Sequence, residues 1–390
     1  MSQLLESRWS ETKEALLEGL QGNKRSVMAT TLENTRKYLA ESATAGATSA
    51  GNVATLNRVI LPVIRRVMPT VIANELVGVQ PMTGPVGQIH TLRVRYADNF
   101  NSSSGTDTAP GDEALSPFKI AEGYSGSAAT DKGASTAALE GVAGNRMSIQ
   151  ILKQTVEAKT RKLSARWTFE AAQDAQAQQG IDIEAEIMAA LAQEITAEID
   201  QEVIASLNSL AGTVLTYDQA AVSGTATFVG DEHAALAVQI NRAANLIAQR
   251  TRRGAGNYAV VSPTTLTLLQ SATTSAFART TEGTFEAPTN TKFVGTLNSA
   301  MKVYVNGYAA TDDVLIGYKG SSESDAPAFY CPYIPLMSSG VVLDPATFEP
   351  VVSFMTRYGY VELTNTASSL GNAADYLAKV AVTTANLKFA

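Results

Sequence analysis

The chain has few of the side chains that build metal sites and most catalytic sites. Its 390 residues include one cysteine, Cys331, and two histidines, His90 and His233. A single thiol excludes an internal disulfide and a cysteine-based metal cluster. Two histidines exclude a histidine-rich metal site and leave little material for a catalytic imidazole. We therefore expect Cys331 to be a small buried side chain beside Tyr330 and Tyr333, and we expect neither a metal nor a cofactor.

Excess positive charge and long apolar runs are also missing. The 30 basic and 37 acidic residues give a net charge of -7, which argues against a basic nucleic-acid binder. The most apolar stretch, residues 59–77, is interrupted by two prolines and three charged residues, so we expect no membrane span. The first residues show no secretion signal, which predicts synthesis in a cytoplasm. Hydrophobic residues make up 45% of the chain, as is typical of a folded protein.

The sequence also lacks the common nucleotide-binding and hydrolase motifs. It contains no Gly-x-x-x-x-Gly-Lys-Ser/Thr phosphate loop, no Gly-x-Gly-x-x-Gly after a strand and no Gly-x-Ser-x-Gly turn. Glu184 and Glu186 lie on one predicted helix without a partner acid, and Asp312-Asp313 is typical of a turn. Because nothing in the sequence supports a catalytic site, we predict that the protein is not an enzyme.

The clearest element that the sequence predicts is a long helix over residues 182–207. Asp182 is a suitable N-cap, and isoleucine, leucine or valine recurs at every fourth position from Ile183 to Val203. At 1.5 Å per residue this helix would be about 39 Å long. With one apolar face along that length, it is expected to act as a structural beam.

Two alternating segments flank a region of low apolar character. Leu92, Val94 and Tyr96 alternate with arginines before this region, and Met147 and Ile149 alternate with polar residues after it. Residues 98–145 between them are dominated by Gly, Ser, Thr, Ala and Asp, so we expect an exposed loop or small insertion and no core. The flanking strands would pair as a long arm with this loop at its tip. With the beam helix and the mixed elements that follow, the pattern predicts an α+β fold.

The first 41 residues are predicted to form a detachable amphipathic segment. Leu16 and Leu17 fall on one helical stripe, Gly22 is expected to end the first helix, and a second short helix is expected over residues 32–39. The small residues from position 42 to 51 indicate a linker. Pro62 and Pro69 are expected to break a further helix over residues 56–76.

Charges are segregated along the chain. No Lys or Arg occurs between Arg166 and Arg242, an interval that holds the acidic face of the predicted beam helix, and basic residues cluster on either side. One interpretation is a solvated acidic face. The other is that patches of opposite charge meet between neighbouring copies and set their register. The residues that the second interpretation selects as intersubunit contacts are Arg65, Arg66, Lys159, Arg161, Lys162, Glu184, Glu194, Glu198, Arg250, Arg252 and Arg253.

Several short segments follow one another in a fixed order. They are Ile60-Leu61-Pro62-Val63-Ile64-Arg65-Arg66, Val77-Gly78-Val79-Gln80-Pro81-Met82, Ala158-Lys159-Thr160-Arg161-Lys162-Leu163, Phe329-Tyr330-Cys331-Pro332-Tyr333, Phe348-Glu349-Pro350-Val351 and Thr356-Arg357-Tyr358-Gly359. As an ordered set, from about residue 56 to the C-terminus, they resemble the major capsid proteins of tailed bacteriophages of the T-even type.

This resemblance implies an HK97-like capsid fold and a structural function. The chain would self-assemble, in hexamers with pentamers as a further form, into an icosahedral head that encloses packaged double-stranded DNA without specific contacts. The division that the resemblance implies is 1–41 for an N-terminal segment, 42–85 for a linker and N-terminal arm, 86–169 for an extended E-loop region with an insertion at 98–145, 170–212 for a peripheral domain with its spine helix, 213–344 for an axial domain and 345–390 for returning strands of the peripheral domain.

The resemblance also implies partners and a processing site. The partners would be many copies of the chain itself, the portal, scaffold, prohead protease and decoration or vertex proteins of the same phage, and no membrane; the chain would assemble in the host cytoplasm and end in the virion. Leu39-Ala40-Glu41 fits the family's protease motif, as do Leu4-Leu5-Glu6, Leu16-Leu17-Glu18 and Ile120-Ala121-Glu122. We expect cleavage between Glu41 and Ser42. The alternatives are an encapsulin-like shell that encloses cargo, a secreted or surface binding module and, most remotely, an enzyme.

Overall fold

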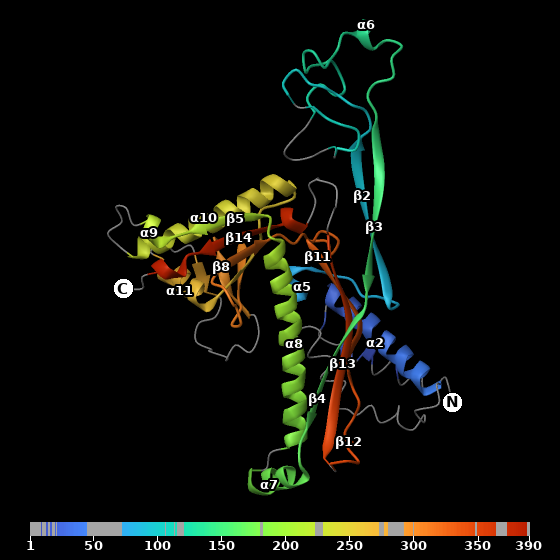
Figure 1. Ribbon diagram of the computed structural model, residues 1–390, viewed down its shortest axis with the longest axis vertical. Helices are drawn as coiled ribbons and strands as arrows, with labels where there is room; N and C mark the ends of the chain where they lie inside the picture. Colours follow the sequence, from blue (N-terminus) through green and yellow to red (C-terminus); the bar gives the residue numbers. More distant parts are fainter. Residues whose placement is uncertain are drawn as a thin grey trace.

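Two β-sheets, a long helix and a projecting two-stranded ribbon make up the described part of the chain in the computed structural model (Figure 1). The structure describes residues 9, 13–14, 16–17, 20, 22–44, 72–105, 107–112, 114, 121–179, 182–222, 229–272, 277–279, 292–298, 300–347, 349–363 and 373–387.

The five-stranded sheet combines segments that are far apart in the sequence. Its centre is β13 (Pro350–Glu362), which pairs antiparallel with β11 (Ala328–Ser338) on one side and with β4 (Lys159–Arg166) on the other. β12 (Val342–Leu343) pairs antiparallel with the start of β13, and β1 (Gly78–Val79) runs parallel to β11 at the edge away from β4.

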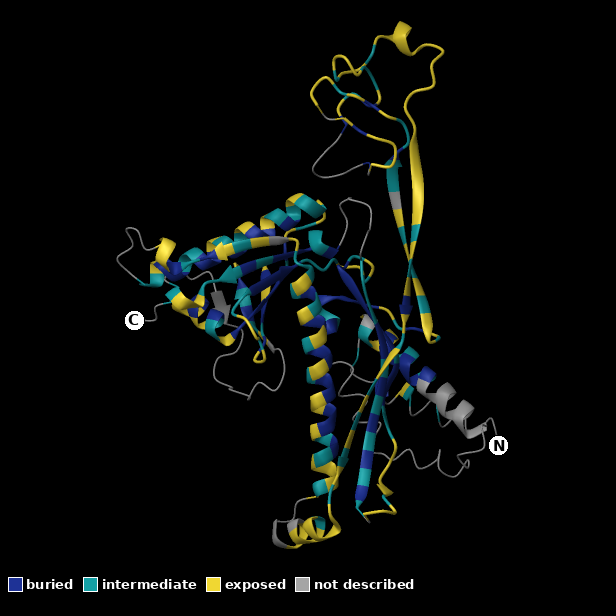
Figure 2. Ribbon diagram, in the orientation of Figure 1, coloured by how far each residue is buried: buried dark blue, intermediate teal, exposed yellow. Residues whose placement is uncertain are grey.

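The helix α8 (Ile183–Leu210) lies along this sheet and confirms the predicted beam (Figure 1). Asp182 Oδ1 accepts a hydrogen bond from the Glu184 amide at 3.1 Å, so the predicted N-cap is also confirmed. One face of the helix is buried from Met188 to Leu207, and Figure 2 shows buried and exposed residues following one another along the helix. Each fully buried leucine or isoleucine contributes roughly 1.5–3 kcal/mol of stability, so this stripe is a large part of the core.

β11 is buried on both of its faces. From Ala328 to Leu336 every residue is buried except Tyr333, which is half-buried. Successive residues of a strand point to opposite faces of its sheet, so no single helix could bury them all. Elements on more than one side of the strand must therefore contribute to its burial.

One of these elements is α2 (Gly22–Thr44), which packs along β11. Met28 and Leu32 of α2 are each 1% exposed and belong to the same core as the buried stripe of α8. Gly22 lies at the first position of α2 with a φ of 61°, a conformation that glycine adopts at little cost. The short helix expected over residues 32–39 is part of this longer helix, which also includes the first residues of the expected linker.

The seven-stranded sheet forms a second body with its own core. In spatial order its strands are β5 (Thr213–Tyr217), β14 (Leu377–Val382), β10 (Val314–Gly317), β6 (Tyr258–Val261), β9 (Met301–Val305), β8 (Lys292–Leu297) and β7 (Phe277–Arg279). The helix α10 (Val229–Thr251) packs against this sheet, and α9 (Gln219–Val222) and α11 (Pro263–Ser271) contact α10. Leu236, Ile240 and Ile247 of α10 are buried in the core that this sheet shares with its helices.

The long arm that the sequence predicts is present as a two-stranded ribbon. β2 (Val86–Tyr96) and β3 (Met147–Glu157) pair antiparallel along their full lengths, from Val86 opposite Glu157 to Tyr96 opposite Met147. The ribbon projects well away from both sheets (Figure 1). The short elements that complete the fold are α5 (Ala73–Leu76), α6 (Thr136–Leu139), α7 (Phe169–Gln179), η1 (Ala373–Asp375) and η2 (Thr384–Asn386).

The residues at the tip of the ribbon form a small module. Tyr96, Phe100 and Tyr124 bury their rings together with two alanines, and the ring centroids of Tyr96 and Tyr124 are 4.6 Å apart. Arg146 Nη2 pairs with Asp98 Oδ1 at 2.9 Å and closes the base of the module. The predicted exposed insertion over residues 98–145 is thus present among the described residues, but the expectation that it has no core is wrong, because a few aromatic side chains form a separate small cluster there.

Truncation of Ile195 in α8 should destabilise the subunit strongly. Ile195 is 1% exposed, so Ile195→Ala leaves a cavity in the main core and should lower the free energy of unfolding by about 2–5 kcal/mol. Urea denaturation of the purified chain measures this change. Gln193→Ala, at an exposed position of the same helix, is the matched control and should change stability little. Equal effects of the two substitutions would contradict the assigned packing face.

Candidate functional site

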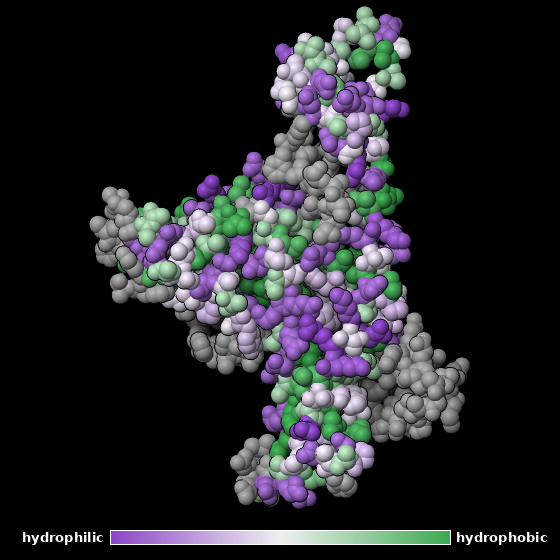
Figure 3. All heavy atoms as spheres, in the orientation of Figure 1, coloured by the Kyte–Doolittle hydropathy of each residue, from purple (hydrophilic) through white to green (hydrophobic). Residues whose placement is uncertain are grey.

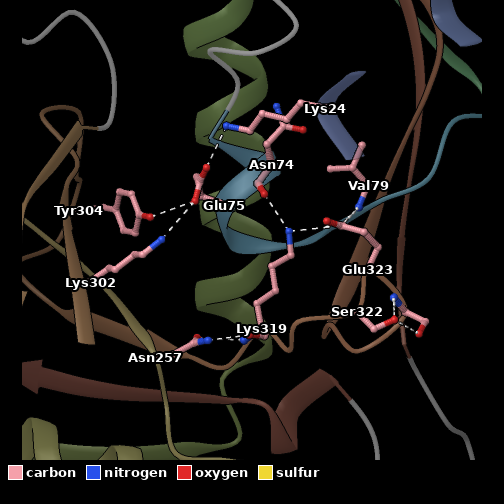
Figure 4. A network of polar contacts seen from close by, with 11 residues as sticks. Lys24, Asn74, Glu75, Val79, Asn257, Lys302, Tyr304, Lys319, Ser322 and Glu323 are labelled. Atoms are coloured by element: carbon pink, nitrogen blue, oxygen red, sulfur yellow. Dashed lines mark hydrogen bonds and ion pairs between the residues drawn. The ribbon is translucent and has the colours of Figure 1, made fainter. Parts of the chain in front are cut away.

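A junction of charged residues joins α5, the short helix that precedes the ribbon, to α2 and to both sheets (Figure 4). Glu75 of α5 accepts a hydrogen bond from Lys24 Nζ of α2 at 3.0 Å, and its other carboxylate oxygen lies 3.7 Å from Lys302 Nζ of β9. Burial tends to raise the pKa of Glu75, but the ammonium groups of Lys24, Lys302 and Lys319 outweigh it and hold this pKa below its usual value. Glu75 is therefore a carboxylate at neutral pH and connects the N-terminal segment to the seven-stranded sheet.

Lys319 is the second centre of this junction (Figure 4). Its Nζ donates to the carbonyl oxygen of Asn74 at 2.8 Å and lies 3.3 Å from Glu323 Oε2. The same Glu323 oxygen accepts a hydrogen bond from the Val79 amide at 3.0 Å. The connection between β10 and β11 is thereby fixed to α5 and β1, which lead into the ribbon.

Asp200 is a buried acid that the sequence interpretation placed on the solvated or intersubunit face of the beam helix. It is 1% exposed, and its Oδ1 accepts a hydrogen bond from the Ile72 amide at 2.8 Å. Its Oδ2 has no hydrogen-bond partner among the described residues. Burial raises the pKa of Asp200 to about 7. Its spacing of four from Thr196 and seven from Leu207, both buried, is the signal that places it on the inner stripe.

Some of the predicted intersubunit contacts already contact each other within one chain. Arg161 Nη1 lies 2.8 Å from Glu198 Oε2, and Arg161 Nη2 lies 2.5 Å from Glu202 Oε2. Arg161 Nε also donates to the Tyr358 hydroxyl at 2.5 Å. These contacts fix β4 and β13 to α8, so the complementary charges of strand and helix act within the subunit. The sequence interpretation did not select Glu202, although its spacing of four from Glu198 places both carboxylates on one face of the helix.

The remaining charged candidates lie on several surfaces. Lys159 and Lys162 are exposed on β4, Glu184 and Glu194 are exposed on α8, Arg250 is half-buried near the end of α10, and Arg252 follows it with a φ of 50°. Arg253 Nη1 pairs with Asp325 Oδ1 at 2.6 Å within the chain. Arg65 and Arg66 lie outside the described residues. Glu41 and Ser42 lie in α2, where the structure describes their backbone only. The intersubunit role of this set stays a prediction.

The cysteine and one histidine are internal. Cys331 is 3% exposed in a cluster with Met82, Val156 and Phe329, which confirms the predicted burial, and burial raises the pKa of its thiol to about 12. His233 is 1% exposed, and its Nδ1 lies 2.5 Å from the Ser271 hydroxyl, which itself donates to the Leu268 carbonyl oxygen. His233 is therefore buried, whereas Ser271, at the end of α11, is exposed. Within the described ranges, no group of three His, Cys, Asp or Glu residues could hold a metal ion. The described helices also include none with the length and apolar character to cross a bilayer.

Apolar side chains are exposed along one face of the ribbon. Leu92, Ile149 and Ile151 are 65%, 67% and 66% exposed, and Met147 near the tip is 54% exposed. Leu92 is paired with Ile151, and Ile149 with Val94, so these side chains share one face of the two-stranded sheet. Figure 3 shows hydrophobic side chains at intervals along the ribbon, with hydrophilic side chains between them. A face of this kind is typical of a protein–protein contact.

A second apolar surface lies at the other end of the molecule. A groove of about 380 Å³ runs between α7, the start of α8 and the segment around β12. Its lining includes Trp167, Phe169, Ile183, Val341 and Leu343, and the carboxylates of Asp182 and Glu184 lie at the same groove. Phe169, Val341 and Leu343 are each more than 40% exposed, so this surface too is open in the isolated chain.

Asp200 should make the stability of the subunit depend on pH. Between its usual pKa of 3.8 and about 7 the folded chain holds this proton more tightly than the unfolded chain does. The contribution of Asp200 to stability should therefore be greatest below this window and fall as the pH rises through it, by up to about 1.4 kcal/mol per pH unit. Asp200→Asn should melt at a higher temperature than the parent at pH 8 and show a weaker pH dependence. Thermal melts from pH 5 to 8 test this, with exposed Glu194→Gln as the control; an unchanged pH dependence in D200N would contradict it.

Comparisons with known proteins agree with the series of segments described above. A family model described as major capsid protein Gp23 matches residues 53–382. The major capsid protein of Vibrio phage KVP40 is 30% identical over 85% of this chain and 82% of its own length, and that of Enterobacteria phage T4 is 31% identical over 83% and 78%.

Solved phage structures are also similar to this chain. The capsid of Myoviridae Phage XM1 aligns with a TM-score of 0.45 at 9% identity, over 80% of this chain and 92% of that chain. A structure from Mycobacterium phage Bobi aligns with a TM-score of 0.47 at 13% identity, over 80% and 90%. The family model and the curated relatives cover most of the sequence, and on their evidence the chain belongs to the family of the major capsid protein Gp23, the structural proteins of phage heads.

Proposed function

We propose that the chain builds an icosahedral head from hexamers, with pentamers where the shell closes, and that this head encloses packaged double-stranded DNA. Membership of the capsid family makes it a structural component of the virion that assembles with copies of itself. The fold supports assembly into a closed head, because it combines a helix-and-sheet body with a projecting ribbon that could reach a neighbouring copy.

The observation that carries the proposal is the exposed apolar face of the ribbon. Leu92, Ile149 and Ile151 are too exposed to stabilise the isolated subunit, yet they form one continuous face. When the ribbon lies on a second copy, this face loses its contact with water, which favours association by roughly 25 cal/mol per Å² of apolar area. A contact between different surfaces of two copies closes rings of subunits, as a capsomer requires. The groove beside β12 is a further apolar surface that a neighbouring copy would cover.

The charged residues would then set register between copies. Lys159 and Lys162 on β4 and Glu184 and Glu194 on α8 are exposed, so they remain available to a neighbour. Such charges guide encounter and orientation more than they add affinity. The net charge of -7 is consistent with a container that encloses DNA without gripping it.

The other partners and the processing step belong to the same proposal. Portal, scaffold, prohead protease and decoration or vertex proteins of the phage are the expected partners. Glu41 and Ser42 lie within α2, so cleavage between them would require the end of that helix to open into an extended segment. The six ranges from 1–41 to 345–390 are the proposed division of the chain into N-terminal segment, arm, E-loop region, peripheral domain, axial domain and returning strands. The encapsulin-like alternative is not favoured, since the curated relatives are phage capsid proteins.

Polar substitutions on the apolar face of the ribbon should stop assembly without unfolding the subunit. We expect the double variant Ile149→Ser and Ile151→Ser to reduce the yield of shells, tubes or sheets at least about tenfold, because each large aliphatic group is worth on the order of 1.5–3 kcal/mol when buried. Electron microscopy and sedimentation measure the assembled fraction.

Gln150→Ser is the matched control for this experiment. Gln150 is exposed on the same strand but points to the opposite face of the ribbon. The control should assemble like the parent chain. Normal shells from the double variant would sink the proposal that the ribbon makes the main contact.

A further inference from the structure

The base of the ribbon is a closely packed joint. Met82, which precedes β2, lies in one cluster with Val156 at the end of β3 and with Phe329 and Cys331 of β11. A Cβ added to Gly359 of β13 would lie 3.2 Å from the Glu157 carbonyl oxygen and 3.3 Å from the sulfur of Met82. The ribbon therefore leaves the five-stranded sheet through a joint with no spare volume, and its direction depends on the position of Met82.

Backbone hydrogen bonds hold the chain beside β11 up to this joint. β1 pairs with β11 through Gly78 and Val79, and the ladder continues with the Gln80 amide on the Tyr330 carbonyl oxygen at 3.1 Å. The Met82 amide then donates to the Pro332 carbonyl oxygen at 3.0 Å. Beyond Met82 the two segments part, and the carbonyl groups at this point need donors from elsewhere.

Asn34 of α2 supplies these donors. Its Nδ2 donates to the Met82 carbonyl oxygen at 2.7 Å and to the Tyr333 carbonyl oxygen at 3.0 Å. Asn34 is 6% exposed; its bond to Met82 is buried and its bond to Tyr333 is partly buried. One amide group of the N-terminal segment thus bridges the two backbones at the point where they separate.

Other contacts hold α2 in place. Val27, Met28 and Leu32 are buried in the main core, and Lys24 is paired with Glu75. The segment before α2 also contacts it, since the Trp9 indole and Lys13 Nζ both reach Glu33 Oε2 at 3.3 Å. The N-terminal segment is therefore built into the subunit core, next to the joint from which the ribbon projects.

We propose that α2 is an intramolecular clamp that fixes the direction of the β2–β3 ribbon through the bridge that Asn34 makes between Met82 and Tyr333. While α2 is docked, the ribbon is held at one angle to the five-stranded sheet. When α2 undocks, the two carbonyl groups lose their donors and the base of the ribbon is freed. A segment near the N-terminus thereby controls the geometry of an arm that begins about fifty residues later. The effect on shell assembly rests on the proposed function of the ribbon; the structural effect does not.

Hydrogen–deuterium exchange of the full chain tests the clamp. In Asn34→Ala, amides of residues 82–87 and 154–157 should exchange at least about tenfold faster, because each buried carbonyl that loses its partner weakens the closed state. Asn34→Asp keeps the shape of the side chain but replaces the donors by oxygen, so its effect should be at least as large. Asn245→Ala, at an exposed position of α10, is the control and should leave these amides unchanged.

Unchanged exchange at the ribbon base in both Asn34 variants, with the seven-stranded sheet still protected, would overturn the proposal. Should a variant fail to fold, the parent chain in low denaturant answers the same question. There the amides of residues 27–34 and 82–87 should open with one free energy and one denaturant dependence, and independent opening contradicts the clamp.

The assembly readout separates this proposal from the proposed function. Faster exchange at the ribbon base together with fewer closed shells in N34D supports both. Faster exchange while the Ile149→Ser and Ile151→Ser variant still assembles normally supports the clamp and removes the assembly role of the ribbon. Loss of assembly in the ribbon variant with unchanged exchange in the Asn34 variants supports the assembly role and removes the clamp.

Discussion

The burial of β11 on both faces is the constraint on which the rest of the structure depends. A strand with an almost continuous run of buried residues has to be covered from several directions. α8 covers the five-stranded sheet along its length, while α2, the segment around β1 and the base of the ribbon pack against β11. Because these elements come from distant parts of the sequence, the strand organises the N-terminal segment, the ribbon and the long helix around one core.

Polar groups inside this core and beside it fix the arrangement of elements that apolar packing alone would leave free to slide. Asp200 binds the Ile72 amide, Asn34 binds two backbone carbonyl groups, and Glu75 collects lysines from two other elements. A buried polar group is costly unless its partners are in place, so the contacts of Asp200 and Asn34 each select one register. All three act on the segments that lead to the ribbon.

The surface shows the opposite pattern. Large aliphatic side chains are exposed on the ribbon and around the groove beside β12, whereas several charges that a solvated surface would carry are used in contacts within the chain. The core stabilises a subunit built in this way, and its exposed apolar surfaces would be buried only by contact with other copies. This division agrees with membership of a family of shell-forming proteins.

The sequence by itself determined the elements whose periodicity is local. The helix from Asp182 onward, the paired strands on either side of residues 98–145, the burial of Cys331 and the α+β class follow from patterns within a few turns or strand residues, and each is observed. Only the tertiary structure decided which partners meet. The contact of Asp200 with the Ile72 amide, the pairing of Arg161 with Glu198 and Glu202, the aromatic core at the ribbon tip and the docking of α2 on β11 all join residues far apart in the chain. Such contacts depend on how elements pack against one another, and the spacing of residues along a single element carries no information about them.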